Sequence, residues 1–151
     1  MPDTTNLAGA LAILRARAEA QITTLPLYWQ DEDNFYLPDD PAPFVFIEFI
    51  ARRGQLVSFG SGPGGNLFRT QGELNAYVFV PRGQGLPVAA GYAETVASAF
   101  RSYRSGGVSC FDATCHPVGE GEALNPPGLS SAAGNYACVV TQVSLHFDQI
   151  G

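Results

Sequence analysis

Five residues in the last third of the chain have side chains that could bind a metal ion or act as nucleophiles. They are Cys110, Cys115, His116, Cys138 and His146. Thiolates and imidazoles are zinc ligands, and a Cys–His pair can support nucleophilic catalysis. A strand over CFDATCH would place Cys110 and Cys115 on opposite faces, about 16 to 17 Å apart. This separation excludes a disulfide between them and, unless the strand bulges strongly, a shared tetrahedral ion, so we interpret the cysteines as small buried hydrophobic residues. A pairing of Cys138 with His146 stays open.

The sequence lacks the motifs that accompany catalysis or phosphate binding. There is no Gly-x-Ser-x-Gly motif, and the loop GSGPGG lacks the Gly-Lys-Ser/Thr ending of a phosphate-binding loop. The acidic run Asp31-Glu32-Asp33 does not have EF-hand spacing, and a solvated turn is its simpler interpretation. We therefore expect neither an enzyme nor a bound metal or cofactor. A small ligand-binding or enzymatic α+β domain with a polar pocket is the alternative from another class.

Composition indicates one folded domain of 151 residues. Hydrophobic residues make up 46% of the chain, which exceeds what disordered segments contain. The net charge is −6 and the chain has no lysine, which argues against a lysine-rich surface for nucleic acid. Arg15 and Arg17 interrupt the first apolar stretch, and no basic segment precedes it, so we expect no signal peptide and no membrane span.

Hydrophobic periodicity predicts two amphipathic helices. The first follows several potential N-cap residues, and its apolar positions are Leu7, Leu11, Leu14, Ala18, Ile22 and Leu25. The second follows a turn at 81–85, and its apolar positions are Val88, Tyr92, Val96, Ala99, Phe100 and Tyr103. Residues 25–43 contain four prolines and are expected to form an extended connector.

The remaining segments predict strands and loops. FVFIEFIA (44–51) has the pattern of a strand covered on both faces, and Arg52-Arg53-Gly54 is expected to turn the chain into a return strand at 55–59. Further strands are expected at 67–80, with one polar face, at 108–115 and at 136–147, separated by a mobile glycine loop at 58–66 and a Pro/Gly-rich loop at 117–134. The predicted fold is α+β: a mixed or mostly antiparallel sheet of about five strands with two main helices packed on one face.

The order of these segments resembles the small tail terminator proteins of long-tailed phages, prophages and phage-like gene transfer agents. The resemblance covers Leu7 to Phe147 and rests on the segments LAILRARAEAQI, LPLYWQDEDNFYLP, FVFIEFIA, FRTQGELNAYVFVPRGQG and AAGYAETVASAF. Its most specific pieces are Trp29–Pro38 and the stretch from Arg69 through Gly72 to Pro81-x-Gly83-x-Gly85. The loop at 117–134 and the lack of lysine depart from the family pattern.

The resemblance implies a non-enzymatic, hexameric ring without cofactors. Such a ring caps the tail-tube protein, stops its polymerisation and offers an attachment surface to the head-completion (stopper) protein. It would assemble in the host cytoplasm and end at the neck of the virion tail. A head–tail connector (neck completion) protein and a tail-tube subunit are the alternative phage roles.

Two groups of residues are the candidate sites of such a ring. Subunit or tube contacts are expected at Arg52, Arg53, Gly60, Gly62, Gly64, Gly65, Arg69, Glu73 and Arg82, with the arginines paired to acidic residues. DNA must cross the ring without specific binding, so an acidic lumen is expected. Its candidate residues are Asp31, Glu32, Asp33, Asp39 and Asp40.

Overall fold

The chain folds around a single six-stranded sheet, seen in a computed structural model that describes residues 3–30, 41–58, 60–118 and 136–151. The elements are α1 (Leu7–Gln21), β1 (Leu27–Trp29), β2 (Phe44–Leu56), β3 (Leu67–Pro81), α2 (Leu86–Phe100), β4 (Arg104–Ser105), β5 (Val108–Pro117) and β6 (Tyr136–Ile150). The strand order is β1-β2-β3-β6-β5-β4, and only β1 and β2 run parallel. The predicted α+β class is confirmed, with β1 and β4 as short additional strands.

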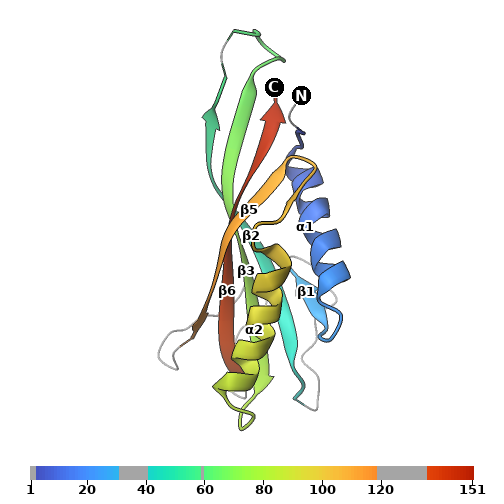
Figure 1. Cartoon of the computed structure of the whole chain (residues 1–151), viewed down its shortest axis with the longest axis vertical. Helices are drawn as coiled ribbons and strands as arrows, with labels where there is room; N and C mark the ends of the chain where they lie inside the picture. Colours follow the sequence, from blue (N-terminus) through green and yellow to red (C-terminus); the bar gives the residue numbers. More distant parts are fainter. Residues whose placement is uncertain (1–2, 31–40, 59, 119–135) are drawn as a thin grey trace.

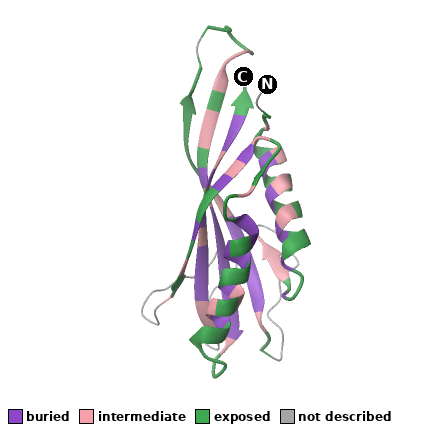
Figure 2. Ribbon diagram, in the orientation of Figure 1, coloured by how far each residue is buried: buried purple, intermediate pink, exposed green. Residues whose placement is uncertain are grey.

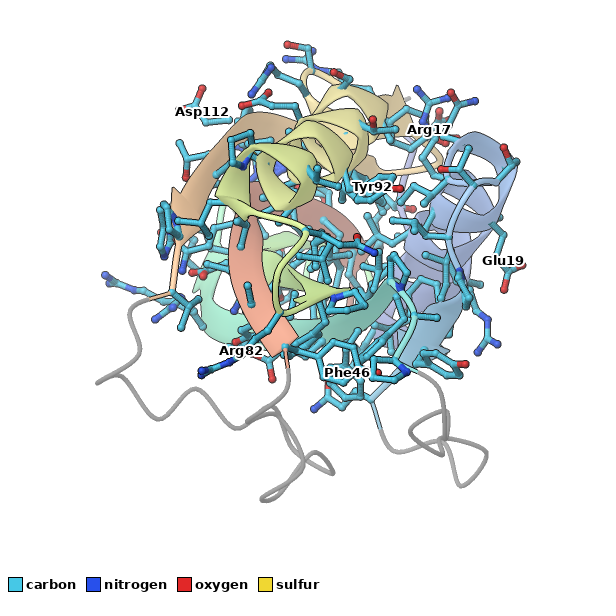
Figure 3. The ribbon with its side chains drawn as sticks, turned by 90° about the horizontal axis from the view of Figure 1, so that it is seen from below. Arg17, Glu19, Phe46, Arg82, Tyr92 and Asp112 are labelled. Carbon is cyan, nitrogen blue, oxygen red and sulfur yellow. The ribbon has the colours of Figure 1, made fainter. Side chains whose placement is uncertain are left out.

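Both helices pack on the same face of the sheet (Figure 1). The Asn6 side chain caps α1 by accepting a hydrogen bond from the Gly9 N–H at 2.9 Å. α1 buries Ala10, Leu14 and Ala18, and α2 buries an alanine-rich stripe that ends at Phe100. Tyr92 lies between the two helices (Figure 3). Described helices are all too short or too polar to cross a bilayer.

The hydrophobic stripe of α1 differs from the predicted one at its start. Leu14, Ala18, Ile22 and Leu25 are buried as expected, but Leu7 is 46% exposed and Leu11 is 39% exposed. The helix instead turns Ala10, a residue too small to stand out in the periodicity, toward the core. Two large apolar side chains therefore lie on the surface of α1.

The predicted turn at Arg52-Arg53-Gly54 is wrong, and so is the return strand at 55–59. β2 continues through these residues to Leu56, and a β-bulge between Ala51 and Arg53 shifts its register with β3. Gly72 faces the bulge, where an added Cβ would lie 3.0 Å from Phe49 Cζ and 3.1 Å from the Ile50 oxygen. The actual turn lies between Leu56 and Leu67, so β2 and β3 form one long hairpin.

A second β-bulge corrects the prediction for the cysteines. Cys110 is buried beneath the helices, and Cys115 packs against the same cluster instead of facing the opposite side. The cause is a register shift between Cys110 and Ala113, which inserts one residue and reverses the alternation.

The face opposite the helices carries its own aromatic cluster at one end of the sheet. Its buried members are Phe44, Phe46, Tyr77, Phe79, Tyr136 and Val140. The Phe44 ring stacks on Phe79 at 4.9 Å and meets the Tyr136 ring edge-on at 5.4 Å. Figure 3 shows Phe46 on the side of the sheet away from α2.

We expect Phe44→Ala to lower the free energy of unfolding by about 3–5 kcal/mol, because the ring is 1% exposed and its removal leaves a cavity. Urea denaturation measures this loss. Phe111→Ala is the matched control, since that ring is 42% exposed and its truncation should cost less than about 1 kcal/mol. Equal losses in the two variants would contradict a buried second cluster.

Candidate functional site

The hairpin of β2 and β3 extends past the helix layer as an arm, which we define as residues 51–58 and 60–72 (Figure 1). Every residue from Ala51 to Ser58 is exposed, whereas β2 from Phe44 to Glu48 is buried. β3 changes in the same way, being mostly exposed or half-buried before Gly72 and mostly buried after it (Figure 2). The arm is thus ordered as strand but contributes little to the core.

The end of the arm presents apolar side chains to solvent. Leu56 is 36%, Val57 42% and Phe68 39% exposed, and Ile150 of the adjoining β6 end is 43% exposed. Leu56 lies directly opposite Phe68 in the register of the hairpin. Leu56 and Phe68 share one face, and Val57 and Ile150 lie on the other, so both faces at this end of the sheet present apolar residues, as interaction surfaces do.

The candidate glycines lie in the loop at the end of the arm. Gly60, Gly62 and Gly64 have positive φ, and an added Cβ at these positions would meet nothing within 4 Å. Gly65 packs closely on Ser61. At these three glycines the shape of the loop is set by backbone angles rather than by side-chain packing. The mobility of residues 58–66 stays a prediction.

Two ion pairs hold the arm together. Arg69 donates to Asp148 of β6 through two hydrogen bonds, Nε to Oδ1 at 2.8 Å and Nη2 to Oδ2 at 2.9 Å. These bonds hold the pKa of Asp148 below its usual value, although burial opposes the shift. Arg52 Nη2 lies 2.7 Å from Glu73 Oε2 on the more exposed β2 side. Glu73 is therefore the partner of one candidate arginine, and Asp148 is a partner that the sequence did not reveal.

The four candidate arginines do not form one group. Arg52, Arg53 and Arg69 belong to the arm, and Arg53 is exposed with no ion pair to any described residue. Arg82 lies in the turn after β3, at the opposite end of the strand (Figure 3). Only the three arm arginines can belong to a contact made by the arm.

The outer edge of β2 is open along the arm. β1 pairs with β2 only at Val45–Ile47, and the Gln30 side chain then accepts a hydrogen bond from the Phe49 N–H at 3.0 Å. From Ala51 to Leu56 this edge faces no strand in the described part of the chain. An unpaired edge offers its N–H and C=O groups to an extended segment.

The other edge of the sheet is closed over much of its length. The Phe111 carbonyl accepts from the Ser102 N–H at 3.1 Å, and the Ala113 carbonyl accepts from Arg101 Nη2 at 2.7 Å. β4 pairs with Val108 and Ser109, and Pro117 has no N–H to donate. The two edges are therefore not equivalent.

A groove of about 500 Å³ lies between α1 and the outer part of β2. Its lining is mainly apolar: Leu7, Leu11, Ala12, Leu14, Arg15, Trp29, Gln30, Ile47, Glu48, Phe49, Ala51 and Leu74. The Arg15 guanidinium lies 5.1 Å from the centre of the Trp29 ring. The exposed Leu7 and Leu11 thus border a hollow that ends at Ala51, where the open edge of β2 begins.

Glu48 is a buried carboxylate that the sequence marked only as an interruption of an apolar run. Its Oε1 accepts from the Tyr77 hydroxyl at 2.7 Å and from Asn75 Nδ2 at 3.3 Å. Burial and this carboxylate raise the pKa of Tyr77, so the phenol remains a hydrogen-bond donor. On the face of the sheet opposite the helices, Glu48 and its two partners lie between the aromatic cluster and the more polar residues toward the arm.

The cysteines and histidines do not assemble into a reactive group. Burial raises the pKa of Cys110 to about 11 and that of Cys138 to about 12, so both thiols are protonated near neutrality. Cys138 and His146 lie eight residues apart on β6, or about 26 Å along an extended strand, which answers the open question of their pairing. Burial, followed by the charge of Arg69, lowers the pKa of His146. Within the described ranges no three potential ligands gather around a metal position.

The candidate lumen residues Asp31, Glu32, Asp33, Asp39 and Asp40 lie outside the described residues. The sequence nevertheless locates the charge: seven of the 14 acidic residues fall in 31–40 and 119–135, whereas all eight arginines fall in the described ranges. The described residues thus carry a formal charge of +1 and those two segments carry −7. Tyr28 and Val118, near the start of each segment, and Tyr136, at the end of the second, all belong to the aromatic cluster.

Comparisons with known proteins support the architecture alone. No protein-family model matches the chain, and no curated protein is detectably similar to it in sequence. A solved structure without a descriptive name has a similar fold, with a TM-score of 0.52. The two chains are 16% identical, and the match covers 91% of this chain and 94% of the other. At that identity the likeness concerns the fold.

We expect Arg69→Ala to lower the free energy of unfolding by about 1.5–3 kcal/mol, because it leaves the largely buried Asp148 carboxylate without its donor. The folded-state pKa of Asp148 lies below its ordinary 3.8, so this stabilisation is present above about pH 4 and is lost as the pH falls further. Denaturant titrations between pH 7 and pH 3 measure both effects.

Arg52→Ala is the matched control, because the Arg52 side chain is 60% exposed and its pair should contribute less than about 1 kcal/mol. If the two variants lose equal stability, or if Arg69→Ala keeps the full acid dependence of the wild type, the pair does not hold the arm as described.

Proposed function

We propose that the protein is a structural, ring-forming subunit that caps the tail tube of a phage or phage-like particle. The observation that carries the proposal is the arm, an ordered hairpin with an open edge and apolar residues at its end. Such a hairpin gains little from the fold of a single chain, and its surfaces favour contacts with other protein chains.

Closed rings require two different surfaces on each subunit. The arm with its open edge, at one side of the sheet, differs from the closed edge at β5, so a contact between copies that involves the arm can be heterologous. Heterologous contacts close into rings when the rotation between copies permits. The number six and the role of tail terminator come from the resemblance in sequence organisation.

The charge distribution agrees with a channel that DNA crosses. We propose that the acidic residues at 31–40 contribute to the lumen, since a negative wall repels phosphates and prevents retention. The arginines of the arm would then lie at protein contacts, away from DNA. Six copies of the segment 31–40, with five acidic residues each, would contribute about −30 to the ring.

The test uses polymerising tubes of the cognate tail-tube protein, to which the purified chain is added at increasing ratios. We expect tube length to fall as the ratio rises, with one six-fold ring at one end of each tube in electron micrographs. A chain found along the whole tube would be a tube subunit, and a chain that binds completed heads but not tubes would be a neck protein; either result contradicts the capping role.

A further inference from the structure

The groove beside α1 is an apolar surface that no described apolar residue covers, and the end of the arm is a second apolar surface of the same chain. Leu7 and Leu11 are 46% and 39% exposed at its border, and Phe49 and Trp29 are only half-buried within it. The groove ends at Ala51, where the open edge of β2 begins. A segment bound here would fill an apolar hollow and find unpaired backbone groups beside it.

We propose that this groove receives the arm of a second copy of the chain. The end of the arm offers Leu56 and Phe68, which share one face of the hairpin and are 36% and 39% exposed. A volume of about 500 Å³ accommodates two to three such side chains. No apolar residue in the described part of the chain covers the groove or the apolar residues at the end of the arm.

The arm of the same copy cannot fill the groove. Phe49 lines the groove and Leu56 lies seven residues further along the same strand, about 23 Å away in extended conformation. Pairing between β2 and β3 and the bond of Arg69 to Asp148 of β6 keep the hairpin extended. Figure 1 shows it directed away from the helices. Donor and acceptor surfaces therefore meet only between copies.

Charge is compatible with this arrangement. Arg53 extends from the arm without an ion pair among the described residues, and Glu19 on α1 is exposed with only an i,i+4 pair to Arg15. Glu19 lies one helical turn beyond Arg15, the basic residue that lines the groove, so an arm that lies along α1 past Arg15 brings Arg53 toward Glu19. Because each copy gives an arm on one side and a groove on the other, the contact is heterologous and repeats around a ring.

This inference specifies the subunit contact of the proposed ring, so it rests on the proposed function but has its own test. Two variants each disrupt one side of the contact: Phe68→Asp changes the arm and Leu11→Asp changes the groove. Both residues are exposed in the single chain, so both variants should fold. Val88→Asp, at an exposed position of α2, is the matched control. The melting temperature of each variant verifies folding.

Sedimentation velocity is measured at a concentration at which the wild-type chain assembles, with cognate tubes added if it does not assemble alone. We expect each variant alone to be monomeric, with association weakened at least about 30-fold, while Val88→Asp assembles as the wild type does. Mixed in equal amounts, the two variants should form a heterodimer and nothing larger. In that dimer an intact arm meets an intact groove, and the remaining arm and groove are both defective.

Rings formed by either variant alone, or a mixture of folded variants that stays monomeric, would overturn the arm-to-groove contact even if wild-type rings cap tubes. A heterodimer in the mixture supports the contact even if the wild-type ring fails to bind tubes, in which case the capping role is the part that fails. A wild-type chain that stays monomeric both alone and on tubes contradicts both proposals.

Discussion

The sheet is about twice as long as the helices that cover it, and this mismatch determines the rest of the structure. β3 and β6 have 15 residues each and span about 50 Å, whereas α1 and α2, also of 15 residues, span about 22 Å. α2 and most of α1 pack over the part of β3 that follows Gly72, so the remainder projects as the arm. There the pair Arg69–Asp148 and strand pairing replace apolar packing as the source of order.

A protein with such an arm has two surfaces that the described part of its fold does not cover. The groove and open edge lie at the base of the arm and the apolar residues at its end, separated by a rigid hairpin. Surfaces that complement each other but cannot meet within one chain favour assembly. The same geometry explains why the closed edge at β5 matters, because a chain with two open edges would also be free to extend its sheet without limit.

Local patterns predicted the elements, and long-range pairing set the details that they missed. The alternation in β3 and the spacing of Val96 and Phe100 correctly located a strand and a helix. Arg52-Arg53-Gly54 has the composition of a turn, yet the bulge and the exposed edge accommodate the same residues within a strand. The partners Arg69 and Asp148 are 79 residues apart, so no spacing rule connects them. Leu7 and Leu11 fit the helical period but face the groove, because exposed apolar residues at an assembly surface look like core residues in a sequence.

Hydrogen exchange at the outer edge of β2 tests the central claim most directly. The outward-pointing amides of Ala51–Leu56 have no strand partner in the described part of the chain, so they should exchange fast in the free chain and slow by at least about tenfold when copies assemble. Amides of Val78–Val80, buried in the centre of the sheet, should be protected equally in both states. Slow exchange of these outward-pointing amides already in the monomer, or unchanged fast exchange in assembled rings, would contradict an arm and edge that contact a second copy.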